Sequence, residues 1–174
     1  MIAGPVLAVG AFVAMEGVSY AAHRWAMHGP GMGWHRSHHL PPQGRLERND
    51  RFPACFSVVG VALFALGTMG PAIGALVWVG IGVTAYGVVY LGVHEVAIHR
   101  RLPVRAPRGA YVRWLRDSHR IHHLYGGEPY GMLLPVVSRD LRRRAASAPG
   151  GDVGRGAPAD PSARRATRAS RSRL

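Results

Sequence analysis

The sequence predicts an all-α integral membrane protein with three to four transmembrane helices and a histidine-rich cap on one membrane face. Two long apolar stretches and ten histidines placed near their ends support this fold class. Apolar residues make up 48% of the chain, yet the mean hydropathy is only +0.02. The apolar and charged residues must therefore be segregated along the chain, as they are in membrane proteins.

The longest apolar stretch runs from Phe52 to Val93, 42 residues without a charged side chain. A single helix of that length would be about 63 Å long, roughly twice the hydrocarbon thickness of a bilayer. The Gly70-Pro71 pair is a natural break, so we expect one helix near residues 52–70 and another near 71–93. The alternative is a buried hairpin in a soluble protein, but so small a domain could not cover two such segments.

Residues 1–22 form a third apolar segment, in which Glu16 is the only charged residue. We interpret this segment as a membrane helix, which gives three spans. A fourth span is possible if the long apolar stretch divides differently.

The arginines predict how the chain is oriented. All 22 basic residues are arginine, and they are frequent between the first and second predicted helices and after the third. The N-terminus and the Gly70-Pro71 turn contain none. By the positive-inside rule, the arginine-rich segments are cytoplasmic. We therefore expect a multi-pass protein of the cell membrane with a periplasmic N-terminus, cytoplasmic histidine motifs and a cytoplasmic C-terminus.

Residues 139–174 carry ten arginines and three acids, and so +7 of the total charge of +13. Their Ala, Arg, Ser, Pro and Gly composition cannot form a core, so we expect a disordered tail. The membrane-embedded domain would then comprise residues 1–138. Because no nucleic-acid-binding fold or aromatic pattern accompanies the charge, we expect no nucleic-acid partner.

All ten histidines fall into four short motifs with the spacings HxxxxH, HxxHH, HxxxxH and HxxHH. In chain order the motifs are His23 and His28; His35, His38 and His39; His94 and His99; His119, His122 and His123. The single cysteine, Cys55, excludes an intramolecular disulfide and a cysteine-based zinc site.

The HxxHH spacing places three imidazoles on one helix face, where they can converge on one or two metal ions. The HxxxxH spacing is different, because five residues turn an α-helix by about 140° from the starting direction. The two imidazoles of each HxxxxH pair can therefore converge only if the helix ends, bends or widens between them.

Ten imidazoles indicate a metal site with more than one ion. Imidazole suits zinc, copper, iron and nickel alike, but a structural zinc needs only about four ligands. Two ions held mainly by neutral imidazoles would keep a high positive charge, which favours iron and bound oxygen without excluding another metal.

Three carboxylates are candidates for orienting the histidines: Glu16, Glu95 and Asp117. Glu16 lies seven residues before His23 on the same predicted helix face and could accept its second ring N–H. Alternatively, Glu16 reaches toward lipid head groups, and Glu95 and Asp117 are simply exposed.

The motifs resemble those of the bacterial β-carotene hydroxylases, a family within the fatty acid hydroxylase/sterol desaturase superfamily. The resemblance rests on the order of the four motifs, on the run from Trp34 to His39, on Asn49-Asp50, and on Thr84 to Gly87 leading to His94. It covers roughly residues 10–138. At Glu95 the chain departs from the family, which more often has aspartate there.

The resemblance implies a non-haem di-iron monooxygenase in which all ten histidines bind two ferrous ions and molecular oxygen is the co-substrate. It would hydroxylate β-carotene at C3 and C3′ of the β-ionone rings, giving β-cryptoxanthin and then zeaxanthin. The substrate would come from the lipid bilayer, and electrons from a donor such as ferredoxin and its reductase. Tyr20, Trp25, Tyr86 and Tyr90 are candidates for the pocket wall, although interfacial or core packing explains them equally well.

Two other functions are compatible with the sequence. One is a hydroxylase or desaturase of another lipid, such as a fatty acyl chain, a sterol or a different carotenoid. The other is a metal-binding membrane protein without catalysis. A metal transporter should have ionisable residues along its spans, whereas here nearly all lie at one face.

Overall fold

The computed structural model describes residues 3–40, 44, 46–105 and 107–148, and every regular element in that part of the chain is helical. Three long helices dominate it. Helix α1 (Ala3–Ala21) continues into the π-helix η1 (Ala22–Met27), α3 covers Arg51–Gly67, and α4 (Ala75–Leu91) continues into the π-helix η5 (Gly92–Ile98). The shorter elements are α2 (Met32–His35), η2 (Arg36–His39), η3 (Arg48–Asp50), η4 (Pro71–Ile73), α5 (Ala110–Tyr125) and α6 (Arg139–Ala146).

Three helices are long and apolar enough to cross a membrane: Ala3–Met27, Arg48–Gly67 and Ala75–Ile98. Among the described residues this confirms three predicted spans and provides no fourth. The first and third spans extend farther than the sequence predicted. The π-helical turns with the HxxxxH motifs continue the same helices, so these motifs form the last turns of the spans.

The surface of the spans is apolar, as a lipid-facing surface must be. Val9 and Val13 on α1 are each 64% exposed, and Val58 on α3 is 69% exposed. Isolated exposed valines are ordinary in soluble proteins, but here large apolar residues are exposed on all three apolar helices, Val88 of α4 among them. The chain is therefore a membrane protein by composition and by exposure.

Close contacts between the spans depend on small residues. Helix α4 lies between α1 and α3 and packs against both. A Cβ atom added to Gly82 would collide with the Ala8 carbonyl of α1, and one added to Gly67 would lie 2.6 Å from the Val77 nitrogen of α4. In lipid, where the hydrophobic effect does not drive helices together, such close backbone approach provides the packing energy.

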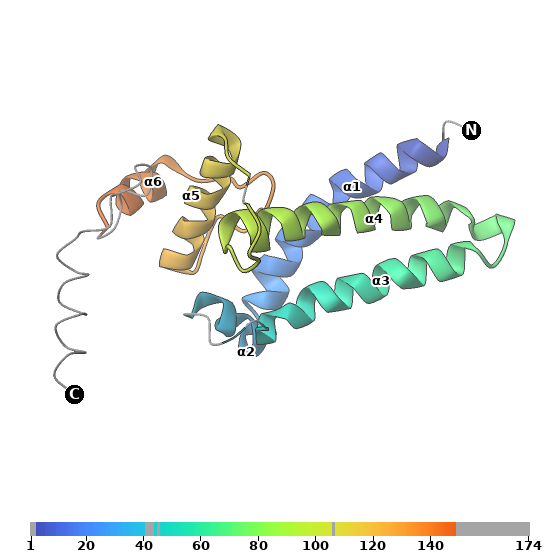
Figure 1. Ribbon diagram of the computed structural model, residues 1–174, viewed down its shortest axis with the longest axis horizontal. Coiled ribbons are helices and arrows are strands. Elements are labelled where there is room, and N and C mark those ends of the chain that lie inside the picture. The colour runs from blue at the N-terminus through green and yellow to red at the C-terminus, as the bar shows by residue number, and fades with distance from the viewer. Residues whose placement is uncertain (1–2, 41–43, 45, 106, 149–174) are drawn as a thin grey trace.

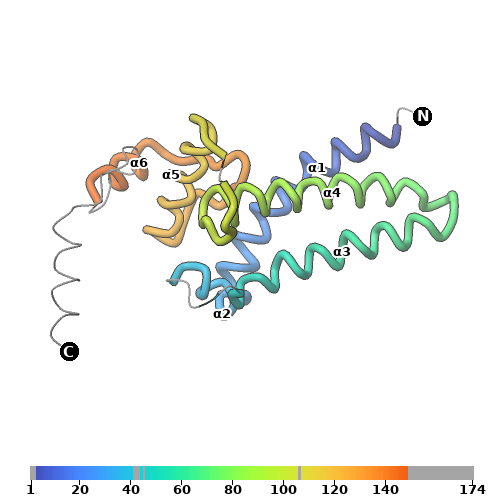
Figure 2. Tube along the Cα trace, in the orientation of Figure 1, coloured from blue at the N-terminus to red at the C-terminus, as the bar shows by residue number. Residues whose placement is uncertain are grey.

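Helices α3 and α4 form an antiparallel hairpin whose turn lies at the same end of the molecule as the N-terminus (Figure 1). Helices α2, α5 and α6 gather at the opposite end, as the chain trace in Figure 2 also shows. The four histidine motifs lie on or beside these cap elements and the adjoining ends of α1 and α4. The fold thus brings all ten histidines to one end of the three spans.

The expectation of disorder from residue 139 is wrong for the first part of the predicted tail. Residues 139–146 form α6, and the Ser138 side chain caps its start by accepting the N–H of Leu141 over 3.2 Å. Asp140 in its first turn and arginines in its last turn suit the helix dipole. Helix α6 contacts α5 and buries Ala145. The rest of the predicted tail, from residue 149, lies outside the described residues.

Candidate metal centre

The two HxxxxH motifs lie on π-helical turns, in which residue i accepts a hydrogen bond from residue i+5. The N–H of His28 donates to the His23 carbonyl over 3.1 Å, and the N–H of His99 donates to the His94 carbonyl over 3.0 Å. The wider turn brings both side chains of a motif to one side. Their ring centroids lie 5.2 Å apart in the first motif and 4.6 Å apart in the second. Of the three ways in which the two histidines of an HxxxxH pair can converge, the structure shows the widened helical turn.

The two HxxHH motifs lie on different kinds of helix. The second one lies on α5, whose buried face carries His119 and His122 together with Leu115. The first crosses the junction of α2 and the 3-10 helix η2, so that His35 ends α2 and His39 ends η2. Each motif distributes its three histidines between two places and does not direct them to a single point.

The histidines gather into two groups. The first group is His23, His28, His35 and His122, and the second is His38, His99, His119 and His123; within each group one ligand nitrogen per residue lies within 4.8 Å of every other. His39 adjoins the first group, with its Nε2 atom 3.1 Å from that of His35. His94 adjoins the second, with its ring centroid 4.6 Å from those of His38 and His99. With these neighbours, each group has five imidazoles in or beside it.

The nitrogen spacing is that of ligands around a metal ion. The Nε2 atom of His35 lies 3.1–3.2 Å from the Nε2 atoms of three other histidines. The Nε2 atom of His119 likewise has three such neighbours, at 2.9–3.4 Å. One ring nitrogen cannot make three hydrogen bonds, because it has either one proton or one in-plane lone pair. A metal ion with bonds of about 2.0–2.1 Å to imidazole would space neighbouring nitrogens by about 3.0–3.4 Å, so the donor set fits one ion in each group.

The Nδ1 atoms of several histidines point outward to hydrogen-bond acceptors. His23 donates to the Tyr130 carbonyl over 3.0 Å, His122 to the Gly127 carbonyl over 2.6 Å and His35 to Asn49 Oδ1 over 2.8 Å. A carbonyl oxygen only accepts, so it requires the proton on Nδ1. The lone pair of each ring is then on Nε2, directed toward the centre of the group, as in metal-binding histidines generally.

Comparison with known proteins identifies the family. The fatty acid hydroxylase family model matches residues 8–140, which is most of the chain. The chain belongs to the fatty acid hydroxylase family. No solved structure matches it.

Several relatives of the chain have names that describe a substrate. A beta-carotene hydroxylase of Pseudescherichia vulneris is 37% identical over 147 residues, covering 82% of each chain. One from Paracoccus sp. strain PC1 is 36% identical, covering 79% of this chain and 90% of the relative. The chloroplastic beta-carotene 3-hydroxylase 2 of Arabidopsis thaliana is 35% identical over 74% of this chain, which spans less than half of that relative.

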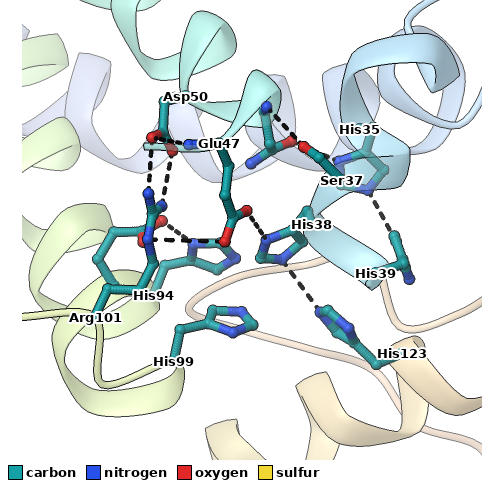
Figure 3. A network of polar contacts seen from close by, with 12 residues as sticks. His35, Ser37, His38, His39, Glu47, Asp50, His94, His99, Arg101 and His123 are labelled. Carbon is teal, nitrogen blue, oxygen red and sulfur yellow. Dashed lines mark hydrogen bonds and ion pairs between the residues drawn. The ribbon is translucent and has the colours of Figure 1, made fainter. Parts of the chain in front are cut away.

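An acidic network borders the second group (Figure 3). Glu95 Oε1 accepts the Nδ1–H of His94 over 2.7 Å, and Glu47 Oε2 lies 3.6 Å from His38 Nδ1. Arg101 joins the carboxylates, because it donates to both oxygens of Asp50 and to Glu95, each over 2.7 Å. Three carboxylates and one guanidinium leave net negative charge beside this group.

The first group has neutral surroundings by comparison, since its outward partners are two backbone carbonyls and the Asn49 side chain. The two groups of histidines therefore differ in the charge of their surroundings. Negative charge beside a ligand increases its basicity, so the second group should be the stronger donor set.

Burial keeps the cap histidines neutral. It lowers the pKa of His35 and His39 to about 4 each, and that of His122 to about 3. Burial also lowers the pKa of His99 to about 3 and that of His123 to about 2. These side chains are therefore unprotonated near pH 7, and their lone pairs are available to a metal ion.

Glu16 does not contact His23, contrary to the sequence prediction. Its carboxylate accepts the backbone N–H groups of Met132, Leu133 and Leu134 over 2.9–3.1 Å, and the Tyr86 hydroxyl over 2.7 Å. The His23 Nδ1–H is bonded to the Tyr130 carbonyl. Glu16 instead fixes the segment that supplies that carbonyl.

The other two predicted carboxylates have different outcomes. Glu95 contacts His94, as an orienting role requires. Asp117 is exposed on α5, and within the described residues no histidine bonds to it, which agrees with the alternative that it is simply exposed. It lies two residues before His119, and about 200° of helix rotation turns it away from the cluster.

Sequence reasoning did not identify Asn49, Glu47 and Arg101 as partners of the centre. Asn49 and Asp50 entered only through the family resemblance, and Arg101 only as one of many cytoplasmic charges. The local signal was the capping box between Glu47 and Asp50 just before α3. That pattern predicts the start of a helix, but it gives no indication that a histidine cluster lies beside it.

Proposed function

We propose that the chain is a β-carotene hydroxylase, a non-haem di-iron monooxygenase that hydroxylates the β-ionone rings at C3 and C3′. The products are β-cryptoxanthin and then zeaxanthin. The observation that carries the proposal is the 36–41% identity to bacterial beta-carotene hydroxylases over most of the chain. The two groups of imidazoles at the cap end of the spans also support it.

The reaction inserts one atom of molecular oxygen into a ring C–H bond and reduces the other to water. It therefore consumes two electrons and two protons, which a donor such as ferredoxin and its reductase supplies. A ring methylene C–H does not yield to acids or bases, and two iron ions would supply the oxidising power. The residues that would hold them are the ten histidines.

The protein's own groups have three tasks in this function. The outward bonds of His23, His35, His94 and His122 fix the ring orientations and keep Nε2 unprotonated. The carboxylates joined by Arg101 balance positive charge at the second group. The apolar spans admit a hydrocarbon substrate from the bilayer and exclude water from the reacting ring.

Expression in a β-carotene-accumulating bacterial host tests the proposal. We expect β-cryptoxanthin and zeaxanthin to appear in extracted pigments, and a His119→Ala variant to give neither. If β-carotene stays unchanged while the wild-type protein inserts and binds iron, the substrate is another lipid and the proposal is wrong. If wild-type protein inserts but binds no metal, an enzyme of this class is excluded.

We also propose that the cap lies in the cytoplasm and that the N-terminus is periplasmic. The arginine distribution supports this orientation, and three spans put the N-terminus opposite the cap. Reporter fusions should show a periplasmic signal at Gly70 and a cytoplasmic signal after Ala148. Signals from the same side at both positions would contradict three crossings. A cytoplasmic signal at Gly70 with a periplasmic signal after Ala148 would place the cap in the periplasm.

A further inference from the structure

An apolar cavity of about 320 Å³ lies among the three spans, with walls from α1, α3 and α4. No charged side chain lines it within the described part of the chain. Two of its hydroxyl groups are already bonded within the protein: Ser57 donates to the Pro53 carbonyl over 2.9 Å, and Tyr86 donates to Glu16 over 2.7 Å. The cavity therefore suits an uncharged hydrocarbon.

Gly87 lies at the centre of the α4 face that forms the floor of this cavity. The lining residues of α4 lie between Val83 and Leu91. At 100° per residue they cover an arc of about 200°, and Gly87 is at its midpoint. A Cβ atom added to Gly87 would meet nothing within 4 Å. The missing side chain at this position thus leaves the middle of the cavity open.

One end of the cavity reaches the histidine groups. Tyr90 lines the cavity and stacks on the His94 ring, with centroids 5.0 Å apart and an interplanar angle of 26°. Met27 also lines it and lies next to His28 in the chain. Of the aromatic residues predicted to form a pocket wall, Tyr86 and Tyr90 do so. Tyr20 and Trp25 are not among the lining residues.

The side of the cavity opens toward the lipid. Val61 on α3 and Val88 on α4 both line it, and they are 68% and 65% exposed. Because both helices are apolar spans, these valines face the hydrocarbon core of the bilayer. A molecule dissolved there can enter sideways without crossing water.

We propose that this cavity binds the cyclic end group of a carotenoid, with Gly87 as the residue that makes room for it. The proposal rests on the proposed function. The volume is near the lower limit for small-molecule sites, so it accommodates a ring and the adjoining chain but not a whole carotenoid. The rest of the molecule stays in the lipid, which the opening beside Val61 and Val88 allows.

A graded series at Gly87 tests the proposal: Gly87→Ala, Gly87→Leu and Gly87→Phe. The matched control is Gly17→Phe, because Gly17 is exposed on α1, does not line the cavity, and also has open space at its Cβ position. We expect product and carotenoid bound per purified chain to fall with side-chain size, by about tenfold or more for leucine and phenylalanine. Gly17→Phe should match the wild type, and iron content should stay unchanged in all variants that insert.

The outcomes separate this proposal from the proposed function. If wild-type protein gives no hydroxylated carotenoid, the proposed function fails whatever the variants do. If wild-type protein is active and Gly87→Phe binds and hydroxylates carotenoid equally well, the cavity proposal is wrong. If Gly87→Phe does not accumulate, Gly87→Leu decides, and unchanged carotenoid binding in that variant also overturns the proposal. If carotenoid binding falls equally in the Gly87 and Gly17 variants, the fall is a general effect of bulky residues, and the cavity proposal is wrong.

Discussion

Replacing His119 with alanine should reduce the iron content from about two ions per chain to about one and abolish hydroxylation. Its Nε2 atom lies 2.9–3.4 Å from three other ligand nitrogens of the second group, so its loss opens that centre. His35→Ala should do the same to the first group, where His35 has the corresponding position. We expect product to fall by about a hundredfold or more in each variant, because even outer partners of metal ligands are worth about 10–100-fold.

Iron per chain after dialysis against a chelator, and hydroxylated pigment per unit of protein, are the two measurements. Arg120→Ala and Arg36→Ala are matched controls, because they change the neighbouring residue in the same motif without removing a lone pair. The double variant should lose both ions but little further activity, since effects within one catalytic unit are not additive. Two ions retained in either single variant, with full activity, would contradict the assignment of the two groups.

The helix-face argument for HxxHH predicted that the histidines meet, but not how they divide. Relative to position i, residues i+3 and i+4 are rotated by about −60° and +40°, so they point about 100° apart. On α5, His119 and His123 therefore lie at the second group and His122 at the first. The first motif crosses the junction of α2 and η2 and divides likewise, with His35 and His39 at the first group and His38 at the second. Which centre receives which histidine depends on the docking of α5 against α2 and η2, and that docking has no local signal.

The hydrogen-bond partners of the histidines that are distant in the chain could not be predicted from the sequence either. The spans and their break at Gly70 follow from hydropathy, and the structure has both. The HxxxxH spacing requires that the helix end, bend or widen within each motif, and the structure shows that it widens. The contact between His23 and the Tyr130 carbonyl joins residues 107 positions apart. The prediction that Glu16 orients His23 assumed that the nearest carboxylate on the helix face would be the partner, whereas a distant loop carbonyl occupies that place.

The Arg101→Gln variant should be destabilised more strongly without metal than with it. Arg101 is 15% exposed and holds Asp50 and Glu95 through three hydrogen bonds of 2.7 Å, and the pKa of its guanidinium is raised by these partners. Glu47 belongs to the same cluster, and burial raises the pKa of its carboxyl. Without the guanidinium, three carboxylates lose a shared positive partner, and a metal ion bound at the second group would supply compensating charge nearby.

We expect the loss for the metal-free protein to be on the order of 2–3 kcal/mol, less than for a fully buried ion pair because the Asp50 side chain is 26% exposed. At roughly 2–4 °C per kcal/mol for a chain of this size, its melting temperature in detergent should fall by about 4–12 °C. The fall should be smaller for iron-loaded protein, because removing the positive guanidinium strengthens the attraction of the carboxylates for a cation, so that bound metal stabilises the variant more than the wild type.

Two further variants distinguish the loss of the Arg101 contacts from the loss of one positive charge. Arg100→Gln removes the same charge from the exposed neighbouring residue and should leave both melting temperatures unchanged. Arg101→Lys keeps the charge but lacks the planar fork that binds two carboxylates at once, so its effect should be intermediate. Equal effects of Arg100→Gln and Arg101→Gln would show that only net charge matters. An equal loss with and without iron would show that the carboxylates exert no field on the second group, and the charge difference between the two centres would then have no energetic meaning.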